Sequence, residues 1–522
     1  MSYILFLPTE LLILILLDLD YIHILCCRRV SRVLQTVIDD DVRFQYKIEL
    51  AIAGMDDGPP GSLMASDRLA MLRERQKAWH SMQYRGVEEI PMGRGDTWEL
   101  YGGVLAQTKG KRRVFLKQLP SVSRNIESRE WATPELDFDI RDFTMDPAQD
   151  LLVAVEHYTS NSTEHSTRKQ DCLVHLLTLS GANHPAAPKG ATLVHPLKLG
   201  GYSYAIQTSQ HLLGVLITSD EAQFVELLIW NWKTGERKMH VIASELPSFA
   251  FLTNRYLLLA VLPVHPEDIV VPPGQADPRL MILDLDRASS EPVMFADLDY
   301  LCTFQYPEFS PICTTHSVTI RSDPAPHWTP HPSLHVPFHV AHGDRLFVIT
   351  LWVLEAGGTW LGLLSLAPTA TFLRALGSLP PGETRRDFPW DEWGLHGSRL
   401  IAAPRTHTTV WVCYVHGQTF VLPQPDSQRA VLALDFNPLA VRRWRVAEAA
   451  AAEARVIDEL AVFRPKRVFT KEVRSGLPYV LRRCRPFADG EEGEFDAVMV
   501  SEDSLVTVAS HSSVRKYRIL TF

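Results

Sequence analysis

The sequence predicts a multidomain α+β protein. A small all-α module of three helices is expected at residues 1–50, a helical connector at 51–90 and a large all-β domain at 91–522. Three observations predict this order. Apolar residues recur at helical spacing up to about residue 80, and after Pro91 short apolar strands alternate with polar turns. The third observation is the length of 522 residues, which is more than one hydrophobic core usually organises.

The first helix is expected to begin near Thr9, a candidate N-cap followed by Glu10. Its apolar residues are Leu11, Leu12, Ile13, Leu14, Ile15, Leu16, Leu17 and Leu19. A helix that is apolar nearly all round must bury two sides. One side can face the module itself, which leaves the other for a partner chain. A second short helix is expected through Ile22, Ile24 and Leu25, and a third from about Arg28 to Ile38.

The order of these residues resembles the F-box pattern over residues 4–50. The match consists of a Leu7-Pro8 start, Glu10-Leu11-Leu12, an Ile-Leu pair one turn later, Ile24-Leu25 and the Arg29-Val30-Ser31-Arg32 run. The sequence departs from the pattern at His23, where the family usually has a capping Asp, and at Val33 and Leu34, where many members have a Trp.

The resemblance implies docking onto a Skp-type adaptor, which links the module to a cullin and a RING subunit. It assigns the adaptor contact to Leu7, Pro8, Leu11, Leu12, Ile15, Leu16, Leu19, Ile24, Leu25, Val30 and Ser31. The alternative from the residues alone is an ordinary helical cap, whose leucines form a core against the next domain.

The connector is expected to contain two helices separated by a Gly/Pro/Asp cluster at residues 54–61. The second helix, predicted from Ser66 to His80, carries Leu69, Leu72 and Trp79 at helical spacing. The run YKIELAIAGMDDGPPGSL and the later RLAMLRERQKAW resemble the connector of a large group of basidiomycete fungal F-box proteins.

The region after residue 91 contains a repeated unit, a tight polar turn followed by an apolar strand. Its copies are DPAQD-LLVAV, TSQH-LLGVLI, LTNRY-LLLAV, AHGDR-LFVIT, LHGSR-LIAAP and VSEDS-LVTVA, with an earlier one near Trp98. The spacing predicts a β-propeller of six to eight blades, and the Lys233-Thr234-Gly235 turn is similar to the end of a WD-repeat blade strand. Two packed β-sandwiches are the alternative. The last strand, residues 514–521, is expected to pair with the strand near Trp98 and close the ring.

Three segments stand apart from the strand pattern. A helical insertion is predicted near residues 437–460, where Arg442, Arg443 and Arg445 form either a solvated face or a partner contact. The basic residues between 109 and 117 are interpreted as a hairpin tip with Gly110 at the turn, and the alternative is a nuclear-import patch or a phosphate-binding surface. Five histidines between 327 and 342 have four-residue spacing, but the intervening prolines exclude a helix, so a Pro-rich surface insertion is expected and no metal site.

Motifs and composition argue against several classes of function. No catalytic, phosphate-binding or metal-binding motif is present, so no enzyme activity, cofactor or metal is expected. The net charge of −9 argues against nucleic-acid binding, and the apolar run 11–17 is too short to span a membrane. Seven scattered cysteines are typical of a reduced cytoplasmic or nuclear protein.

These observations together predict the substrate-recognition subunit of a Skp–cullin–F-box ubiquitin ligase. The propeller would bind an unknown protein target through residues that the sequence does not identify. The alternative is a non-ligase interaction scaffold whose N-terminal helices only cap the propeller.

Overall fold

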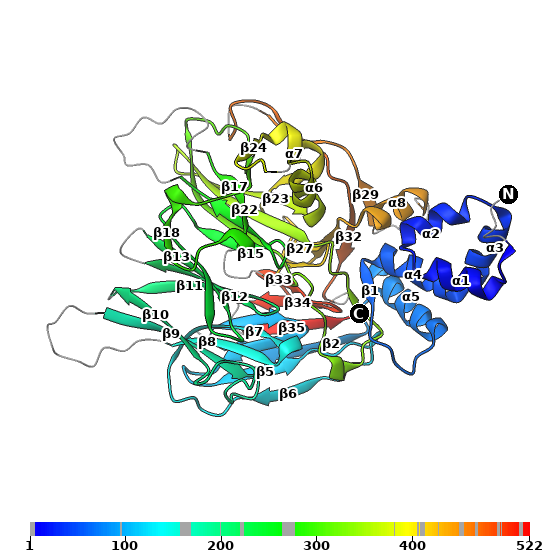
Figure 1. Ribbon diagram of the computed structural model, residues 1–522, viewed down its shortest axis with the longest axis horizontal. Helices are drawn as coiled ribbons and strands as arrows, with labels where there is room; N and C mark the ends of the chain where they lie inside the picture. The colour runs from blue at the N-terminus through cyan, green and yellow to red at the C-terminus, as the bar shows by residue number, and fades with distance from the viewer. Residues whose placement is uncertain are drawn as a thin grey trace.

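The protein consists of a ring of β-sheets with a bundle of helices projecting from one side (Figure 1). The structure is a computed structural model. It describes residues 6–93, 97–156, 169–198, 200–219, 224–263, 277–380, 382–404, 407, 413–425, 427–447, 454–464, 468–487, 491, 493–510 and 515–522. None of the helices in these ranges is long and apolar enough to cross a membrane.

The N-terminal module contains α1 (Thr9–Leu17), α2 (Tyr21–Arg28) and α3 (Arg32–Asp40). Thr9 is the first residue of α1 and not its cap, since Pro8 holds the N-cap position without a side-chain bond. Ser31 accepts a hydrogen bond from the Leu34 amide, which explains why α3 begins at Arg32 and not near Arg28. Each helix contributes to the module's core, which contains Leu16 of α1, Ile24 of α2, and Leu34 and Ile38 of α3.

The connector consists of α4 (Val42–Ala53), β1 (Met55–Asp57) and α5 (Ala65–Ser81). Gly54 ends α4 in the left-handed region at φ 66°, a conformation that favours glycine. Buried Leu50, Leu69 and Leu72 pack α4 against α5. The predicted pair of helices separated by a Gly/Pro/Asp cluster is therefore present.

In the part of the chain that the structure describes, seven mainly antiparallel sheets follow in chain order, and we number them as blades 1–7. Blade 1 contains β3 (Trp98–Tyr101), β4 (Val104–Thr108), β5 (Val114–Gln118) and β6 (Arg129–Ala132). Blade 2 contains β7 (Ile140–Asp146), β8 (Leu151–Glu156), β9 (Lys169–Thr178) and β10 (Thr192–Lys198). Blade 3 contains β11 (Tyr202–Ser209), β12 (Leu212–Ser219), β13 (Val225–Asn231), β14 (Glu236–Ala243) and the parallel addition β18 (Pro292–Met294).

Blade 4 contains β15 (Ser248–Phe251), β16 (Tyr256–Val261), β17 (Arg279–Asp284), β19 (Cys302–Gln305) and the parallel addition β24 (Arg386–Phe388). Blade 5 contains β20 (Cys313–Arg321), β22 (Leu346–Glu355), β23 (Trp360–Pro368) and β25 (Arg399–Ala402). Blade 6 contains β26 (Val415–His416), β27 (Thr419–Pro423), β28 (Val431–Asp435), β32 (Tyr479–Cys484) and β29 (Ala454–Ile457). Blade 7 contains β33 (Ala497–Val500), β34 (Ser504–Ala509), β35 (Lys516–Thr521) and β2 (Gly86–Pro91).

The remaining elements lie between or beside the blades. Two-stranded sheets are formed by β1 with β21 (Phe338–Val340) and by β30 (Ala461–Phe463) with β31 (Val473–Ser475). The helices are α6 (Thr369–Gly377), α7 (Trp390–Gly397) and α8 (Pro438–Ala447). Short 3-10 turns occupy η2 (Pro147–Gln149), η3 (Leu285–Arg287), η4 (Phe295–Asp297) and η5 (Pro332–Leu334).

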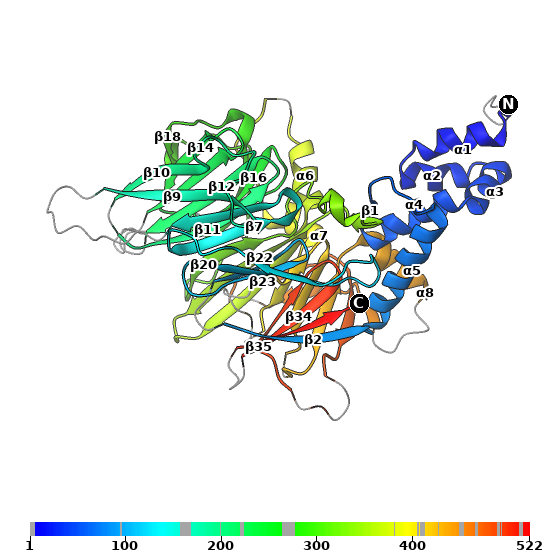
Figure 2. The same cartoon turned by 90° about the horizontal axis from the view of Figure 1, so that it is seen from below.

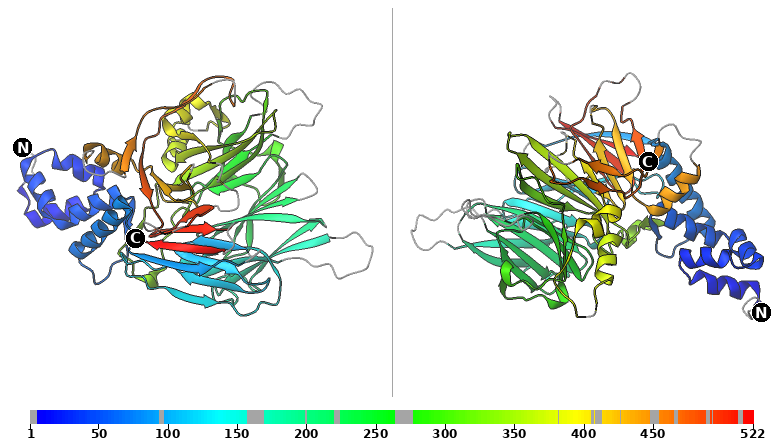
Figure 3. Two further views of the ribbon diagram at one scale, coloured as in Figure 1. Left: turned by 180° about the vertical axis from the view of Figure 1, so that it is seen from behind. Right: turned by 90° about the horizontal axis from the view of Figure 1, so that it is seen from above.

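The blades close into a ring, because every neighbouring pair shares a hydrophobic core. Blade 7 meets blade 1 where Val506 and Tyr517 pack with Leu100 and Leu105. Continuous apolar strands are buried on both faces in such a ring, as the repeat predicts. The all-β domain is therefore a seven-bladed β-propeller and not a pair of sandwiches (Figure 3).

The ring closes by a different strand pair from the one that the sequence predicts. β35 pairs with β34 and with β2, whereas β3 near Trp98 pairs with β4 inside blade 1. β2 precedes blade 1 in the chain but is the outermost strand of blade 7. The first and last segments of the domain are thereby hydrogen-bonded to each other.

The repeat also needs one correction. Five of the six copies are the second strand of a blade, but LHGSR-LIAAP forms β25, the fourth strand of blade 5. The second strand of blade 6 is β27, which follows the turn at Gly417. β25 resembles an inner strand because α7 and β31 cover it, so that Arg399 and Leu400 are buried.

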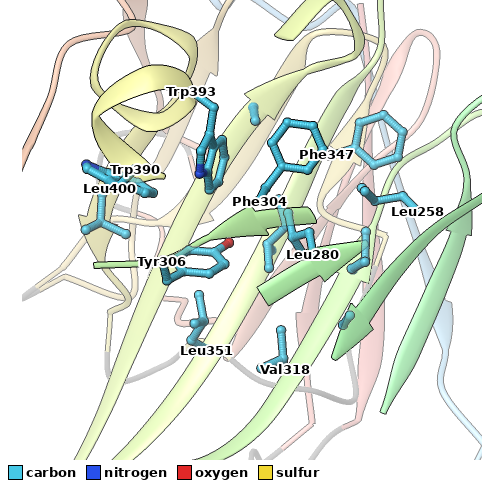
Figure 4. Packing of buried hydrophobic residues seen from close by; sticks show 14 of the residues in the cluster. Leu258, Leu280, Phe304, Tyr306, Val318, Phe347, Leu351, Trp390, Trp393 and Leu400 are labelled. Carbon is cyan, nitrogen blue, oxygen red and sulfur yellow. The ribbon is translucent and has the colours of Figure 1, made fainter. Parts of the chain in front are cut away.

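The core between blades 4 and 5 illustrates how helices seal the ring's outer side (Figure 4). Phe304 of β19 meets Phe372 of α6 edge-on, with ring centroids 5.1 Å apart. Trp393 of α7 lies 5.5 Å from the same Phe304 ring and donates its indole N–H to the Gln305 carbonyl at 3.0 Å. Aromatic pairs in this geometry add to the energy of burial.

Candidate partner-binding surfaces and their junction

The N-terminal module presents an apolar surface at the end of the molecule that lies farthest from the propeller (Figure 2). Leu11, Leu14 and Ile15 of α1 are 46%, 57% and 43% exposed. Phe6 before the helix and Ile22 of α2 are also exposed. Concentrated apolar exposure of this kind is typical of an interaction site.

The residues assigned to the adaptor divide into three groups by burial. The exposed ones are Leu7, Pro8, Leu11, Ile15 and Val30, and the half-buried ones are Leu19, Leu25 and Ser31. The buried ones are Leu12, Leu16 and Ile24. The buried residues hold the helices together, so the surface that this chain presents consists of the other two groups.

Between Phe6 and the end of α3, four large apolar residues are exposed that were not among those assigned: Phe6, Leu14, Ile22 and Val33. Leu14 could have been included from the sequence, because α1 is apolar on all sides and one side was expected to face a partner. Spacing alone could not say which leucines face α3, because both sides of α1 are equally apolar.

An ion pair and a helix cap lie at the polar edge of this surface. Arg28 on α2 donates to both carboxylate oxygens of Asp39 on α3, at 2.6 and 2.9 Å, and this bond lowers the pKa of Asp39. Asp20 accepts hydrogen bonds from the His23 amide and ring, at 2.9 and 2.8 Å, and so caps α2. The cap of α2 is thus supplied by Asp20, three residues before the His23 position at which the sequence departs from the family.

Comparison with known families now identifies the module. Residues 4–46 match the F-box domain. The chain carries an F-box. F-box domains generally bind Skp1-type adaptors, and in this protein the F-box precedes a β-propeller.

The propeller is similar to WD40 domains among solved structures. The WD40 domain of Toxoplasma gondii coronin aligns over 84% of this chain and 86% of that chain, with 9% identity and a TM-score of 0.35. The WD40 domain of SCAP from fission yeast aligns over 83% and 85%, with 10% identity and a TM-score of 0.33. No curated protein sequence matches the chain. The fold assignment rests on the sheet order and the ring of shared cores.

A set of contacts that we call the junction joins the F-box connector to the propeller. Its first part is the antiparallel pair β1–β21, in which residues 55–57 pair with residues 338–340. The Pro337 carbonyl accepts hydrogen bonds from the Tyr46 hydroxyl at 3.0 Å, the Gly58 amide at 2.9 Å and Arg68 at 3.3 Å. The segment expected to be a Pro-rich surface insertion is therefore a docking strand for the connector.

The second part of the junction is α8, the basic helix of the predicted insertion. Asn437 donates to the carbonyls of Ala51 and Ile52, at 3.2 and 3.0 Å, and thereby satisfies the C-terminal end of α4. Arg443 pairs with Glu49 of α4 at 2.6 Å. The described part of α8 therefore contacts the connector, residues 448–453 lie outside the described ranges, and residues 454–457 form β29.

The third part of the junction is a buried ionic cluster around Asp503. Arg75 of α5 and Arg124 each donate to Asp503 at 2.5 Å, and the Ser121 hydroxyl donates to it at 2.5 Å. Burial alone would raise the pKa of Asp503, but Arg124 and Arg75 outweigh burial and hold it well below its usual range. One carboxylate thereby joins the connector to blades 1 and 7.

Inside the ring, charged groups near the inner strands also have structural partners. Arg345 is fully buried and donates to the carbonyls of Phe251 and Leu252, at 2.8 and 2.9 Å, and to Pro324 at 3.0 Å. Burial lowers its pKa to about 10 and raises the pKa of Asp323 to about 6. Arg345 thus connects blade 4 to blade 5.

The basic segment 109–117 forms the predicted hairpin. β4 and β5 pair antiparallel on either side of Gly110, which has φ 64°. Lys117 points back into the structure and is bonded to Glu88 at 2.5 Å and Glu130 at 2.7 Å. The cluster therefore has a structural role at its inner end.

Proposed function

We propose that this protein is the substrate-recognition subunit of a Skp–cullin–F-box ubiquitin ligase. The F-box binds the Skp-type adaptor through its exposed apolar surface, and the propeller binds a target protein. Ubiquitin transfer takes place in other subunits. This chain accelerates it by raising the concentration of the target near the conjugating enzyme.

The exposure of the α1 surface carries this proposal. A scaffold whose helices only cap the propeller would bury Leu11, Leu14 and Ile15 against the blades. These side chains instead are exposed at the end opposite the propeller, while α4 and α5 make the contacts with it. An apolar surface left in water at the far end of a rigid connector favours a partner chain over a structural cap.

The test is co-purification with a Skp-type adaptor. The Leu11→Asp/Ile15→Asp variant places two charges on the proposed surface at exposed positions, so the helix itself should fold. We expect the wild type to bind and the variant to lose binding by more than 100-fold, because charges buried in an apolar interface are costly.

The matched control is Val194→Asp/Val462→Asp, which adds two charges at exposed apolar positions of the propeller, outside the F-box and its connector. It should bind the adaptor like the wild type. A folded wild type that binds no adaptor would favour the scaffold function.

A further inference from the structure

We propose that Asp56, His339 and His342 form a zinc-binding site at the junction between the F-box connector and the propeller. One ligand atom from each side chain lies within 4.8 Å of the other two. Asp56 belongs to the connector strand β1, and both histidines belong to the propeller segment that pairs with it. The site needs no assumption about the adaptor and does not depend on the proposed function.

The strand pairing places the first two ligands opposite each other. Asp56 and His339 are direct cross-strand partners in the β1–β21 pair. Directly opposed residues of an antiparallel pair bring their side chains together on one face. The Asp56 carboxylate is also held from the other side, because its Oδ2 accepts a hydrogen bond from the His342 amide at 2.9 Å.

His339 has the tautomer that a metal ligand needs. Its Nδ1 lies 3.0 Å from the Val340 carbonyl, which can only accept, so Nδ1 carries the proton. Nε2 then presents its lone pair. A ligating histidine typically donates its other ring N–H to a carbonyl or carboxylate in this way. His339 is also 5% exposed, so its ring has little freedom to turn away.

His342 brings the third ligand atom to the cluster. Its Nε2 lies 3.7 Å from Asp56 Oδ2, which is beyond hydrogen-bond distance. Its ring centroid lies 5.1 Å from that of His339. A metal ion bound by all three side chains would account for the convergence of these groups.

The donor set selects the metal. Two imidazole nitrogens and one carboxylate oxygen suit zinc, whereas magnesium and calcium prefer oxygen donors alone. Three protein ligands leave a fourth tetrahedral position for water or for a side chain of a bound partner. A metal here would connect β1 directly to the segment after β21 and so strengthen the contact between the connector and the propeller.

A second cluster supplies a matched control. His195 and His240, from blades 2 and 3, both bond to Glu226 through Nε2, at 2.9 and 2.6 Å. Their ligand atoms also lie within 4.8 Å of one another. This cluster already satisfies its Nε2 atoms internally, so we assign the metal to the junction.

The experiment uses untagged full-length protein stripped with EDTA and dialysed. Co²⁺ is titrated by absorbance, and Zn²⁺ by calorimetry. We expect visible ligand-field bands of tetrahedral Co²⁺ and displacement of Co²⁺ by Zn²⁺. The His342→Gln and Asp56→Asn variants should each weaken Zn²⁺ binding by at least 10-fold, and His240→Gln should leave the junction site intact.

Thermal unfolding provides a second measurement. A metal that binds only the folded state raises the melting temperature. Zn²⁺ should therefore stabilise the wild type and His240→Gln, but not His342→Gln or Asp56→Asn. The proposal fails if the wild type binds no Zn²⁺, or if binding survives in His342→Gln and Asp56→Asn while His240→Gln abolishes it.

Discussion

Asp503 is the residue on which the stability of the junction depends most. It is 3% exposed and accepts hydrogen bonds from Arg75, Arg124 and Ser121. Replacing it with Ala would leave the buried Arg75 guanidinium without its counter-ion and Arg124 with Glu502 alone. We expect the free energy of unfolding to fall by about 3–5 kcal/mol, measured by urea denaturation at pH 7.

The matched control is Asp299→Ala, which removes an ion pair with Arg287 whose side chains are both about half exposed. It should cost no more than about 1 kcal/mol. The pKa of Asp503 is lower in the folded state than its unfolded value, so the carboxylate stabilises the protein fully above about pH 4 and loses this effect as the pH falls further. Equal costs for the two variants at pH 7 would contradict the assigned role.

The sequence identified the residues of the F-box but not their partners. The pattern placed Leu11 to Ile15 on one helix, yet only the packing of α3 decides that Leu12 is buried and Leu11 exposed. Asp503 was part of a polar turn in the repeat. Its burial depends on Arg75 and Arg124, which lie far away in the chain, and no local pattern indicates such a pairing.

Among the elements, β2 has the clearest testable role, because it is the outer strand of blade 7 and pairs with β35. Successive residues of an antiparallel strand alternate between pointing their amides toward the neighbouring strand and away from it. Val87 and Ile90 are three residues apart, so the amide of one of them points toward β35. A Val87→Pro/Ile90→Pro variant should lose at least one inter-strand hydrogen bond and about 1–3 kcal/mol of stability.

Hydrogen–deuterium exchange of residues 516–521 measures this effect directly. Exchange should be faster in the proline variant and unchanged in Val87→Thr/Ile90→Thr, which keeps both amides and the β-branched shape preferred in strands. Unchanged exchange in the proline variant would show that β2 does not hold the last blade. The sequence did not predict β2, because its partner lies at the opposite end of the chain and its six residues adjoin the connector.

For the whole molecule, the repeats predicted a propeller because most blades carry their own local pattern of turn and apolar strand. The junction has no such pattern, since β21, α8 and Asp503 belong to three separate segments that meet only in the fold. The histidine segment has the same property, because no pattern within residues 327–342 indicates that residues 338–340 pair with the connector strand β1.

The junction should hold the F-box at a fixed angle to the propeller. An Arg68→Ala/Arg443→Ala variant removes the bonds of Arg68 to Asp57 at 2.7 Å and to Pro337, and the pair between Arg443 and Glu49. Small-angle X-ray scattering should then show a broader distribution of shapes than the wild type, because the two units are no longer fixed by these contacts.

Arg112→Ala/Arg287→Ala is the matched control, since it removes two surface ion pairs away from the junction. Its scattering should superimpose on that of the wild type. Identical scattering from the Arg68/Arg443 variant would mean that the remaining junction contacts, among them the β1–β21 pair and the Asp503 cluster, fix the angle without these two arginines. A broader distribution would mean that these ionic contacts set the direction in which the propeller presents a target. This direction matters because a target bound to the propeller is positioned near a catalytic centre only as precisely as the connector positions the propeller.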